Sequence, residues 1–309
     1  MWAKLTKLQK FFFVLILLEL IVAIVGKYLC EKYSNISKLE IKRLVILQII
    51  GAVYMLVPAI SVLIVEKWNF RKIFRDYNIR LKAINIYKSA KYILLTAFLL
   101  PVLIMFFSYL FGNVFGIKEF GFLIISKEDL YPLALTNLPA FFHEFTSRML
   151  IGIPLLTVVS LFTGCTFNLF FALGEEIAWR GFLEKEMTVS KKLKPLLIGI
   201  IWGLWHTPLI LLGLNFKDHY IGGIFVMVIV CIALAYYFSR SLHQSRTLLV
   251  PAAMHGIINA FSVTIASDIF VKTGNPLLGP PLGLTFALSV VTILFLLRLF
   301  RKRTINEET

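Results

Sequence analysis

Eight long apolar runs divide this chain, and they restrict its fold more than any other feature of the sequence. An α-helix needs about 20 residues to cross roughly 30 Å of hydrocarbon, and the runs are of about that length. A soluble protein would interrupt such runs with polar faces, which this chain seldom does. The sequence therefore predicts an all-α, polytopic transmembrane helical bundle. The approximate spans are Phe11–Gly26, Leu44–Val65, Tyr92–Phe115, Met149–Leu173, Pro195–Leu214, Ile221–Ser239, Leu248–Ala266 and Leu282–Phe300.

The composition indicates the same class of protein. Of 309 residues, 59% are apolar and 16% are charged, against about 45–50% and about 25% in soluble domains. A net charge of +15 would suggest a nucleic-acid partner in a soluble protein, but membrane proteins concentrate Lys and Arg in their cytoplasmic loops. No basic module with stacking aromatic residues is present. We expect the lipid bilayer, and no nucleic acid, as a partner.

The positions of Lys and Arg predict the orientation of the bundle. The segment Lys67–Lys91 carries eight basic residues, which predicts that it faces the cytoplasm. The Lys191–Lys194 cluster, the Arg240–Arg246 loop and the Arg301–Arg303 tail then fall on the same side, so both termini are expected to be cytoplasmic. The loop Lys27–Arg43 disagrees, because it should be external and yet holds five basic residues.

The chain is expected to form one membrane domain. We assign residues 1–148 to N-terminal spans and loops, residues 149–266 to a catalytic core, and residues 267–309 to the last span and a basic cytoplasmic tail. The three cysteines, Cys30, Cys165 and Cys231, are too few and too scattered for a disulfide framework or a CxxC metal site. No cleavage site follows the first apolar run, so we interpret it as a retained helix.

Ionisable residues at the end of the fourth span are the first candidates for a functional site, because charges inside a membrane are costly. Adjacent residues of a helix point about 100° apart, so Glu175 and Glu176 cannot both face one partner. Glu176 and Arg180 are four residues apart and can form an ion pair. Glu175 is left without a counter-ion, which suits a general base working near neutral pH. The alternative is that all three are interfacial side chains at the end of the span.

Two histidines in later spans weaken that alternative. His206 lies about eleven residues into the fifth span, or roughly 16 Å deep, and His255 about seven residues into the seventh, or roughly 10 Å deep. Asn259 shares a helix face with His255, and Trp202 has the same four-residue relation to His206. One buried histidine is usually structural, but two histidines, an asparagine and a carboxylate pair on one side of the bilayer predict a site.

Two other polar groups are weaker candidates. His143-Glu144 begins like a zinc-protease motif, but Ser147 stands where the second histidine must be. Glu19 in the first span is better explained as a helix-packing or interfacial group.

The ordered motifs Glu175-Glu176-x-x-x-Arg180, Trp202-x-x-x-His206 and His255-x-x-x-Asn259 resemble the CPBP family (CAAX protease and bacteriocin-processing, also called Abi). Its best-known members are the type II CAAX-prenyl endopeptidases. The resemblance covers about Met149 to Ala266. One departure is Trp202, where the family usually has Phe, although an aromatic packing role survives the change.

The resemblance implies an intramembrane endopeptidase that acts on membrane-anchored, prenylated proteins or peptides. Glu175 and His206 would hold and deprotonate the attacking water, and His255 and Asn259 would stabilise the oxyanion. Glu176, Arg180 and Trp202 would shape the site and orient the peptide. No cofactor is expected. The alternative is a metalloprotease-like site in which Glu175, His206 and His255 bind zinc.

Two other functions stay open at this point. One is a bacteriocin self-immunity or partner-binding membrane protein that needs no catalysis. The other is a transporter or proton relay, against which the absence of paired repeats argues. The implied location is the plasma membrane in a prokaryote or the endoplasmic reticulum membrane in a eukaryote.

Overall fold

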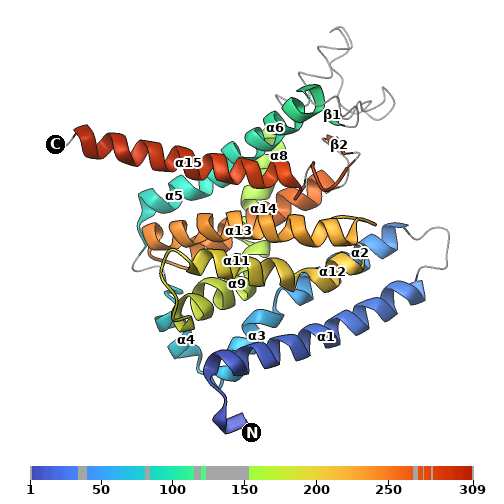
Figure 1. Ribbon diagram of the computed structural model, residues 1–309, viewed down its shortest axis with the longest axis vertical. Helices are drawn as coiled ribbons and strands as arrows, with labels where there is room; N and C mark the ends of the chain where they lie inside the picture. Colours follow the sequence, from blue (N-terminus) through green and yellow to red (C-terminus); the bar gives the residue numbers. More distant parts are fainter. Residues whose placement is uncertain are drawn as a thin grey trace.

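The computed structural model describes residues 2–33, 40–80, 84–114, 120–122, 153–266, 271–273, 275–279 and 281–307. Helices make up nearly all the regular structure of these residues (Figure 1). The one strand pair described is antiparallel, with Phe120 of β1 (Phe120–Phe122) opposite Thr273 of β2 (Val271–Thr273). The other elements are η1 (Trp2–Lys4), α1 (Lys7–Tyr33), α2 (Glu40–Tyr54), α3 (Val57–Val65), α4 (Phe70–Asp76), α5 (Ile86–Leu94), η2 (Leu95–Leu99), α6 (Leu100–Val114), α8 (Ile153–Cys165), α9 (Phe167–Glu176), η5 (Ile177–Leu183), α10 (Glu184–Glu186), α11 (Lys194–Trp205), α12 (Thr207–Leu211), α13 (Tyr220–Ser245), α14 (Leu249–Ala266) and α15 (Leu284–Glu307).

Several of these helices are long and apolar enough to cross a membrane. In the described part of the chain there are five, or six if one bent pair counts as a single span. The last two predicted spans correspond to shorter apolar helices, Leu249–Ser262 and Leu284–Phe300. The all-α class of a multi-pass integral membrane protein is therefore confirmed. The five long helices are Lys7–Lys32, Ile46–Val65, Ile86–Ser108, Lys194–Leu211 and Tyr220–Ser245.

Large apolar side chains lie on the outer surface of the bundle. On α1, Ile24 is 68% exposed and Tyr28 is 59% exposed. Exposed apolar surface on this scale is costly in water, so the outer face of α1 suits contact with lipid. Figure 1 shows α1 and α15 on opposite sides of the central pair α11 and α13.

The fourth predicted span is not one straight helix. α8 ends at Cys165, α9 begins at Phe167, and the two are bent by 60°. The hydroxyl of Thr166 donates to the carbonyl of Phe162 at 2.6 Å, an interaction that often bends helices. The bend lets α9 turn into the interior of the bundle.

The fifth predicted span, Pro195–Leu214, corresponds to the single apolar span Lys194–Leu211, which contains a local turn at His206. α11 ends at Trp205, His206 is its C-cap, and α12 starts at Thr207 with Pro208 in its first turn. Proline has no N–H to donate and its ring crowds the preceding turn. His206 therefore lies at a break between two helices.

Glycines allow the central helices to approach closely. A Cβ at Gly203 would lie 2.5 Å from Cα of Val228, and one at Gly199 would lie 2.5 Å from Cα of Ile232. Small residues four apart are typical of close helix pairs in membranes. They bring α11 against α13, next to the site described below.

Most of the ion pairs gather at one end of the bundle. Lys7 binds Glu66 at 2.8 Å, Lys185 binds Asp76 at 2.7 Å, and the amide of Leu248 donates to the carbonyl of Asn78 at 3.1 Å. Two of the segments predicted from their basic residues to share one side of the membrane, Lys67–Lys91 and Arg240–Arg246, also meet, because the amide of Asn85 donates to the carbonyl of Ser245 at 3.0 Å.

Candidate active site

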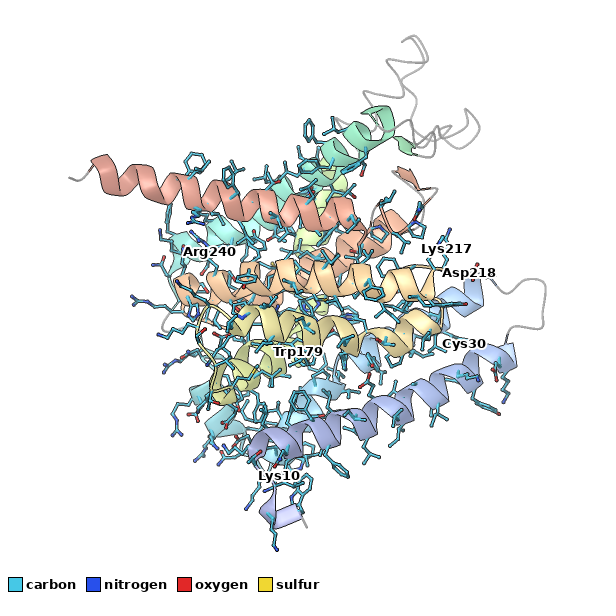
Figure 2. The ribbon with its side chains drawn as sticks, viewed as in Figure 1. Lys10, Cys30, Trp179, Lys217, Asp218 and Arg240 are labelled. Carbon is cyan, nitrogen blue, oxygen red and sulfur yellow. The ribbon has the colours of Figure 1, made fainter. Side chains whose placement is uncertain are left out.

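Glu175 lies in the interior at the end of α9, with 1% of its surface exposed. Its Oε2 accepts hydrogen bonds from the indole Nε1 of Trp179 at 3.1 Å and of Trp202 at 2.5 Å. Both donors are neutral, and no ion pair of Glu175 occurs among the described residues. The carboxylate is thus held by hydrogen bonds without a cation at its oxygens. Figure 2 shows Trp179 well inside the bundle.

The backbone after Glu176 is a π-helix, η5, rather than the α-helix expected from the sequence. π-helical turns are rare and often occur at functional sites. All residues from Ala178 to Leu183 are buried. A Cβ at Gly181 would meet the ring of Tyr77 at 2.9 Å, so the absence of a side chain there lets the segment pack closely.

Glu176 points to a different partner from Glu175, as their spacing predicts. Its Oε1 accepts from Nη1 of Arg180 at 3.0 Å and from Nδ1 of His255 at 2.9 Å. Both side chains of the Glu176–Arg180 ion pair are completely buried. This carboxylate orients His255, because an ionised carboxylate only accepts hydrogen bonds and so fixes a proton on Nδ1.

Arg180 is only partly satisfied within the described part of the protein. Its guanidinium lies over the ring of Trp202 at 4.3 Å and of Phe238 at 5.0 Å. Its Nε and Nη2 are buried and have no hydrogen-bond partner there, and neither has Oε2 of Glu176. Buried unsatisfied donors are costly, and Nε and Nη2 of Arg180 are such donors within the described residues.

His206 joins the site through Trp202. Its Nδ1 lies 2.8 Å from the carbonyl oxygen of Trp202, and a carbonyl can only accept, so Nδ1 carries the proton. The Nε2 of the neutral ring is then free to accept a proton. Trp202 therefore binds Glu175 with its indole and His206 with its backbone. No direct hydrogen bond between Glu175 and His206 occurs among the described contacts.

His255 and Asn259 lie on α14, one helical turn apart. The structure does not aim them at one protein group: His255 binds Glu176, while Nδ2 of Asn259 donates to Sδ of Met55 at 3.5 Å. The two polar groups thus flank the carboxylate pair from the α14 side.

Several residues near the site were missed by sequence analysis. Trp179 could have been found, because it is four residues from Glu175 on the same helical face. Tyr54 and Met55 come from α2 and the turn after it, and no local pattern connects them with the site. Cys231 lies 4.0 Å from Nδ1 of His206, and the apolar run around it gives no hint of this.

The zinc alternative does not fit this arrangement. In the described part of the chain, no group of three or more His, Cys, Asp or Glu side chains could hold a metal ion. The hydrogen bonds at Nδ1 of His255 and of His206 leave Nε2 of each ring open, but no third ligand is grouped with them among the described residues. Glu175, His206 and His255 therefore do not form a zinc ligand set in the described part of the chain. The discarded motif at His143 lies outside the described residues.

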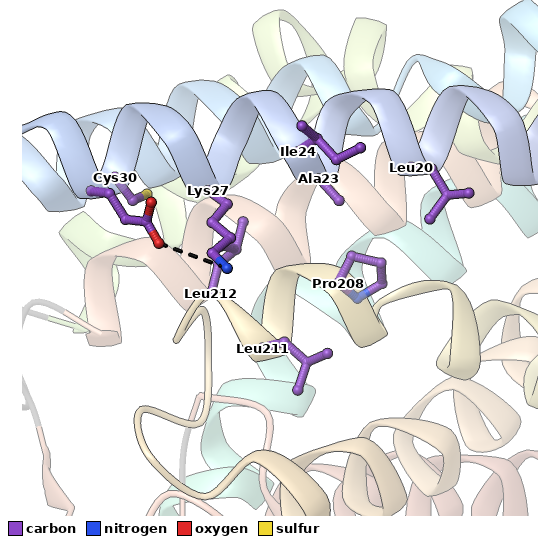
Figure 3. Close-up of a pocket in the computed structure, with 9 residues that line it drawn as sticks. Leu20, Ala23, Ile24, Lys27, Cys30, Pro208, Leu211 and Leu212 are labelled. Atoms are coloured by element: carbon purple, nitrogen blue, oxygen red, sulfur yellow. Dashed lines mark ion pairs between the residues drawn. The ribbon is translucent and has the colours of Figure 1, made fainter.

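A groove of about 730 Å³ opens beside the break at His206. It lies between α1 and α12, and its lining is mostly apolar (Figure 3). Lys27 and Glu31 form an exposed ion pair of 3.8 Å at one end of it. Its lining residues are Leu20, Ala23, Ile24, Lys27, Cys30, Glu31, Pro208, Leu211 and Leu212.

The fold and the site together define a multi-pass integral membrane protein with a buried glutamate and histidine site. Comparison with known families identifies its core. Residues 154–261 match the family described as Type II CAAX prenyl endopeptidase Rce1-like, so this segment is a Rce1-like domain of the CPBP family. The match runs from α8 into α14 and confirms the resemblance expected over Met149–Ala266. No curated protein matches the chain.

Proposed function

We propose that this protein is an intramembrane endopeptidase that hydrolyses a peptide bond near the cytoplasmic side of the membrane. The observation that carries the proposal is the environment of Glu175. A buried carboxylate with no cation at its oxygens suits a general base, and the two indole donors on Oε2 hold it in place. The CPBP family domain, with its CAAX-type proteases, supports the same reaction.

In this mechanism Glu175 is the general base. It removes a proton from a water molecule as the water oxygen attacks the scissile carbonyl carbon. The free Nε2 of His206 holds that water in position. Once the C–N bond breaks, the carboxylic acid of Glu175 returns the proton to the leaving amine.

His255 and Asn259 stabilise the oxyanion of the tetrahedral intermediate. Donors aimed at developing negative charge in a dry site contribute strongly to catalysis. Nε2 of His255 serves as such a donor when the ring carries a second proton, and the Glu176 carboxylate on its Nδ1 holds the ring in place. The weak thioether partner of Asn259 is readily exchanged for an oxyanion.

Glu176, Arg180 and Trp202 orient the substrate. The free Nε and Nη2 of Arg180 bind a peptide carbonyl or the C-terminal carboxylate. The ring of Trp202 packs against one face of the Arg180 guanidinium, and its indole Nε1 donates a hydrogen bond to Glu175. The groove along α1 takes an apolar chain of a membrane-anchored, prenylated substrate.

The membrane topology completes the proposal. The bundle has eight spans with both termini cytoplasmic, residues 149–266 as its catalytic core and residues 1–148 and 267–309 around it. The ion pairs at one end of the bundle support this orientation, because basic segments concentrate on the cytoplasmic side. The location is the plasma membrane in a prokaryote or the endoplasmic reticulum membrane in a eukaryote.

The test is cleavage of a prenylated CAAX-type peptide by the purified protein in proteoliposomes. We expect wild type to release the C-terminal tripeptide. The rate for Glu175→Gln should be lower by a factor of about a thousand or more, because the base is removed. Glu184→Gln is the matched control, since Glu184 lies on α10 outside the site, and it should keep wild-type activity.

Cleavage in the presence of a chelator distinguishes the glutamate mechanism from a zinc-dependent one. Activity that survives EDTA supports the glutamate mechanism, whereas loss on chelation and recovery with zinc would overturn it. Equal cleavage by wild type and Glu175→Gln would show that Glu175 is not the general base.

A further inference from the structure

A short turn outside the Rce1-like domain touches the elements that carry the site. α2 ends at Tyr54 and α3 begins at Val57, so Met55 and Leu56 form the turn between them. This turn precedes residue 154, where the family match begins, by about a hundred residues of sequence. Its contacts reach α9, the end of α11 and α14.

Tyr54 holds the end of α11. It is completely buried, and its hydroxyl donates to the carbonyl oxygen of Trp205 at 2.8 Å. Its ring stacks on the ring of Trp205 with centroids 4.3 Å apart and an interplanar angle of 26°. Trp205 is thus fixed through both its backbone and its side chain.

Trp205 is the last residue before His206. Because α11 ends at Trp205 and Pro208 has no N–H to donate, the helical hydrogen-bond ladder is incomplete next to His206. The ring of Trp205 also packs edge-on against His206 at 4.9 Å and against Trp179 at 5.7 Å. Trp179 is a donor to Glu175. Tyr54 is therefore linked to His206 through Trp205, and to Glu175 through Trp205 and Trp179.

Met55 contacts α9 and α14. Its carbonyl oxygen would lie 2.7 Å from a Cβ at Gly174, the residue before Glu175. Its Sδ accepts from Nδ2 of Asn259 at 3.5 Å. A thioether is a weak acceptor, so it orients the amide without competing strongly with a charged oxygen.

We propose that Tyr54 is a positioning residue for the hydrolysis, and that it sets the place of the His206 imidazole through the backbone and ring of Trp205. The inference rests on the proposed function for its catalytic consequence. The contact itself is independent of substrate. Fixing a reacting group to within a few tenths of an ångström has large effects on rate, and α2 supplies that restraint from outside the family domain.

The test is Tyr54→Phe, which removes the hydroxyl and keeps the stacked ring. We expect kcat to fall about five- to tenfold with KM unchanged, the scale of one lost hydrogen bond. In a His206→Ala background the same substitution should have no further effect, because Tyr54 acts through His206. Tyr92→Phe is the matched control: Tyr92 is also completely buried, and its hydroxyl accepts from Nε of Arg240 at 3.2 Å, away from the site.

A second readout needs no activity. When the protein is labelled with ¹⁵N-histidine, its NMR spectrum contains imidazole signals from five histidines. The signals that are missing from the spectrum of His206→Ala are those of His206. We expect Tyr54→Phe to shift the His206 imidazole signals and Tyr92→Phe to leave them in place. Unshifted signals in Tyr54→Phe would overturn the inference, as would an unchanged kcat. If wild-type protein cleaves no peptide, the proposed function fails, and the signals alone decide whether Tyr54 positions His206.

Discussion

The indole Nε1 of Trp202 donates a hydrogen bond to Oε2 of Glu175 at 2.5 Å. The CPBP pattern that this chain resembles usually has Phe at this position, and Phe cannot donate. Sequence analysis expected an aromatic packing role to survive the change, and the ring of Trp202 does pack against Phe238 and His255. Trp202 adds to this a polar contact with the carboxylate on which the proposed mechanism depends.

Trp202→Phe should therefore lower activity even though it restores the family's usual residue. We expect kcat to fall about five- to tenfold, because one neutral hydrogen bond that orients Glu175 is lost while Trp179 still donates. Steady-state peptide cleavage is the measurement. Trp68→Phe is the control, since Trp68 is 55% exposed. Full activity in Trp202→Phe would mean that Trp179 alone holds Glu175.

The buried Glu176–Arg180 pair makes a prediction about stability. Arg180→Met should cost about 3 kcal/mol, the low end for a broken buried pair, because His255 still donates to Glu176. The double variant Glu176→Gln/Arg180→Met should regain much of that loss, since no unpaired carboxylate remains. Thermal unfolding in detergent compares the two. A double variant less stable than Arg180→Met would contradict this account.

Much of the fold could be predicted from composition and spacing. Runs that are apolar on every face leave few alternatives to buried or membrane helices, and each of the eight predicted segments contains helix. The Glu176–Arg180 pair followed from a spacing of four residues. These features are local, and local geometry determines them.

Other features depend on contacts between distant segments. Tyr54 meets Trp205 across 151 residues of sequence, and no periodicity predicts such a contact. The π-helical turn after Glu176 also has no sequence signal, because its residues would suit an α-helix equally well. Pro208 did indicate a break after His206, but the apolar run through it concealed that signal.

Close packing of α11 against α13 leads to a prediction for Gly203. Gly203→Ala should destabilise the protein by about 2 kcal/mol or more, as overpacking does, because the new Cβ would lie 2.5 Å from Cα of Val228. Gly51→Ala is the matched control. A Cβ at Gly51 would lie 3.8 Å from Leu214, an ordinary contact, and alanine favours helix. Thermal unfolding of both variants checks this, and equal stability would show that α13 shifts without cost.

The charged end of the bundle predicts a dependence of stability on pH. Glu66 lies just beyond α3, and burial alone would raise its pKa. Hydrogen bonds and charge from Lys7 and Lys72 outweigh burial and hold the pKa of Glu66 below its ordinary value. A depressed pKa stabilises the folded state above the ordinary pKa, and this contribution disappears as the pH falls through the folded-state value.

Glu66→Gln should accordingly be less stable than wild type at pH 7, by about 1–2 kcal/mol, because both lysines are partly exposed and solvent screens them. We expect the difference to shrink as the pH falls below the ordinary pKa of a glutamate, and to vanish once wild-type Glu66 is protonated. Thermal unfolding from pH 7 to pH 3 measures it. Glu31→Gln is the control, because the Lys27–Glu31 pair is more than two-thirds exposed on both sides and contributes little. A difference that stays constant over this range would mean that Glu66 stabilises the fold by packing and not by its charge.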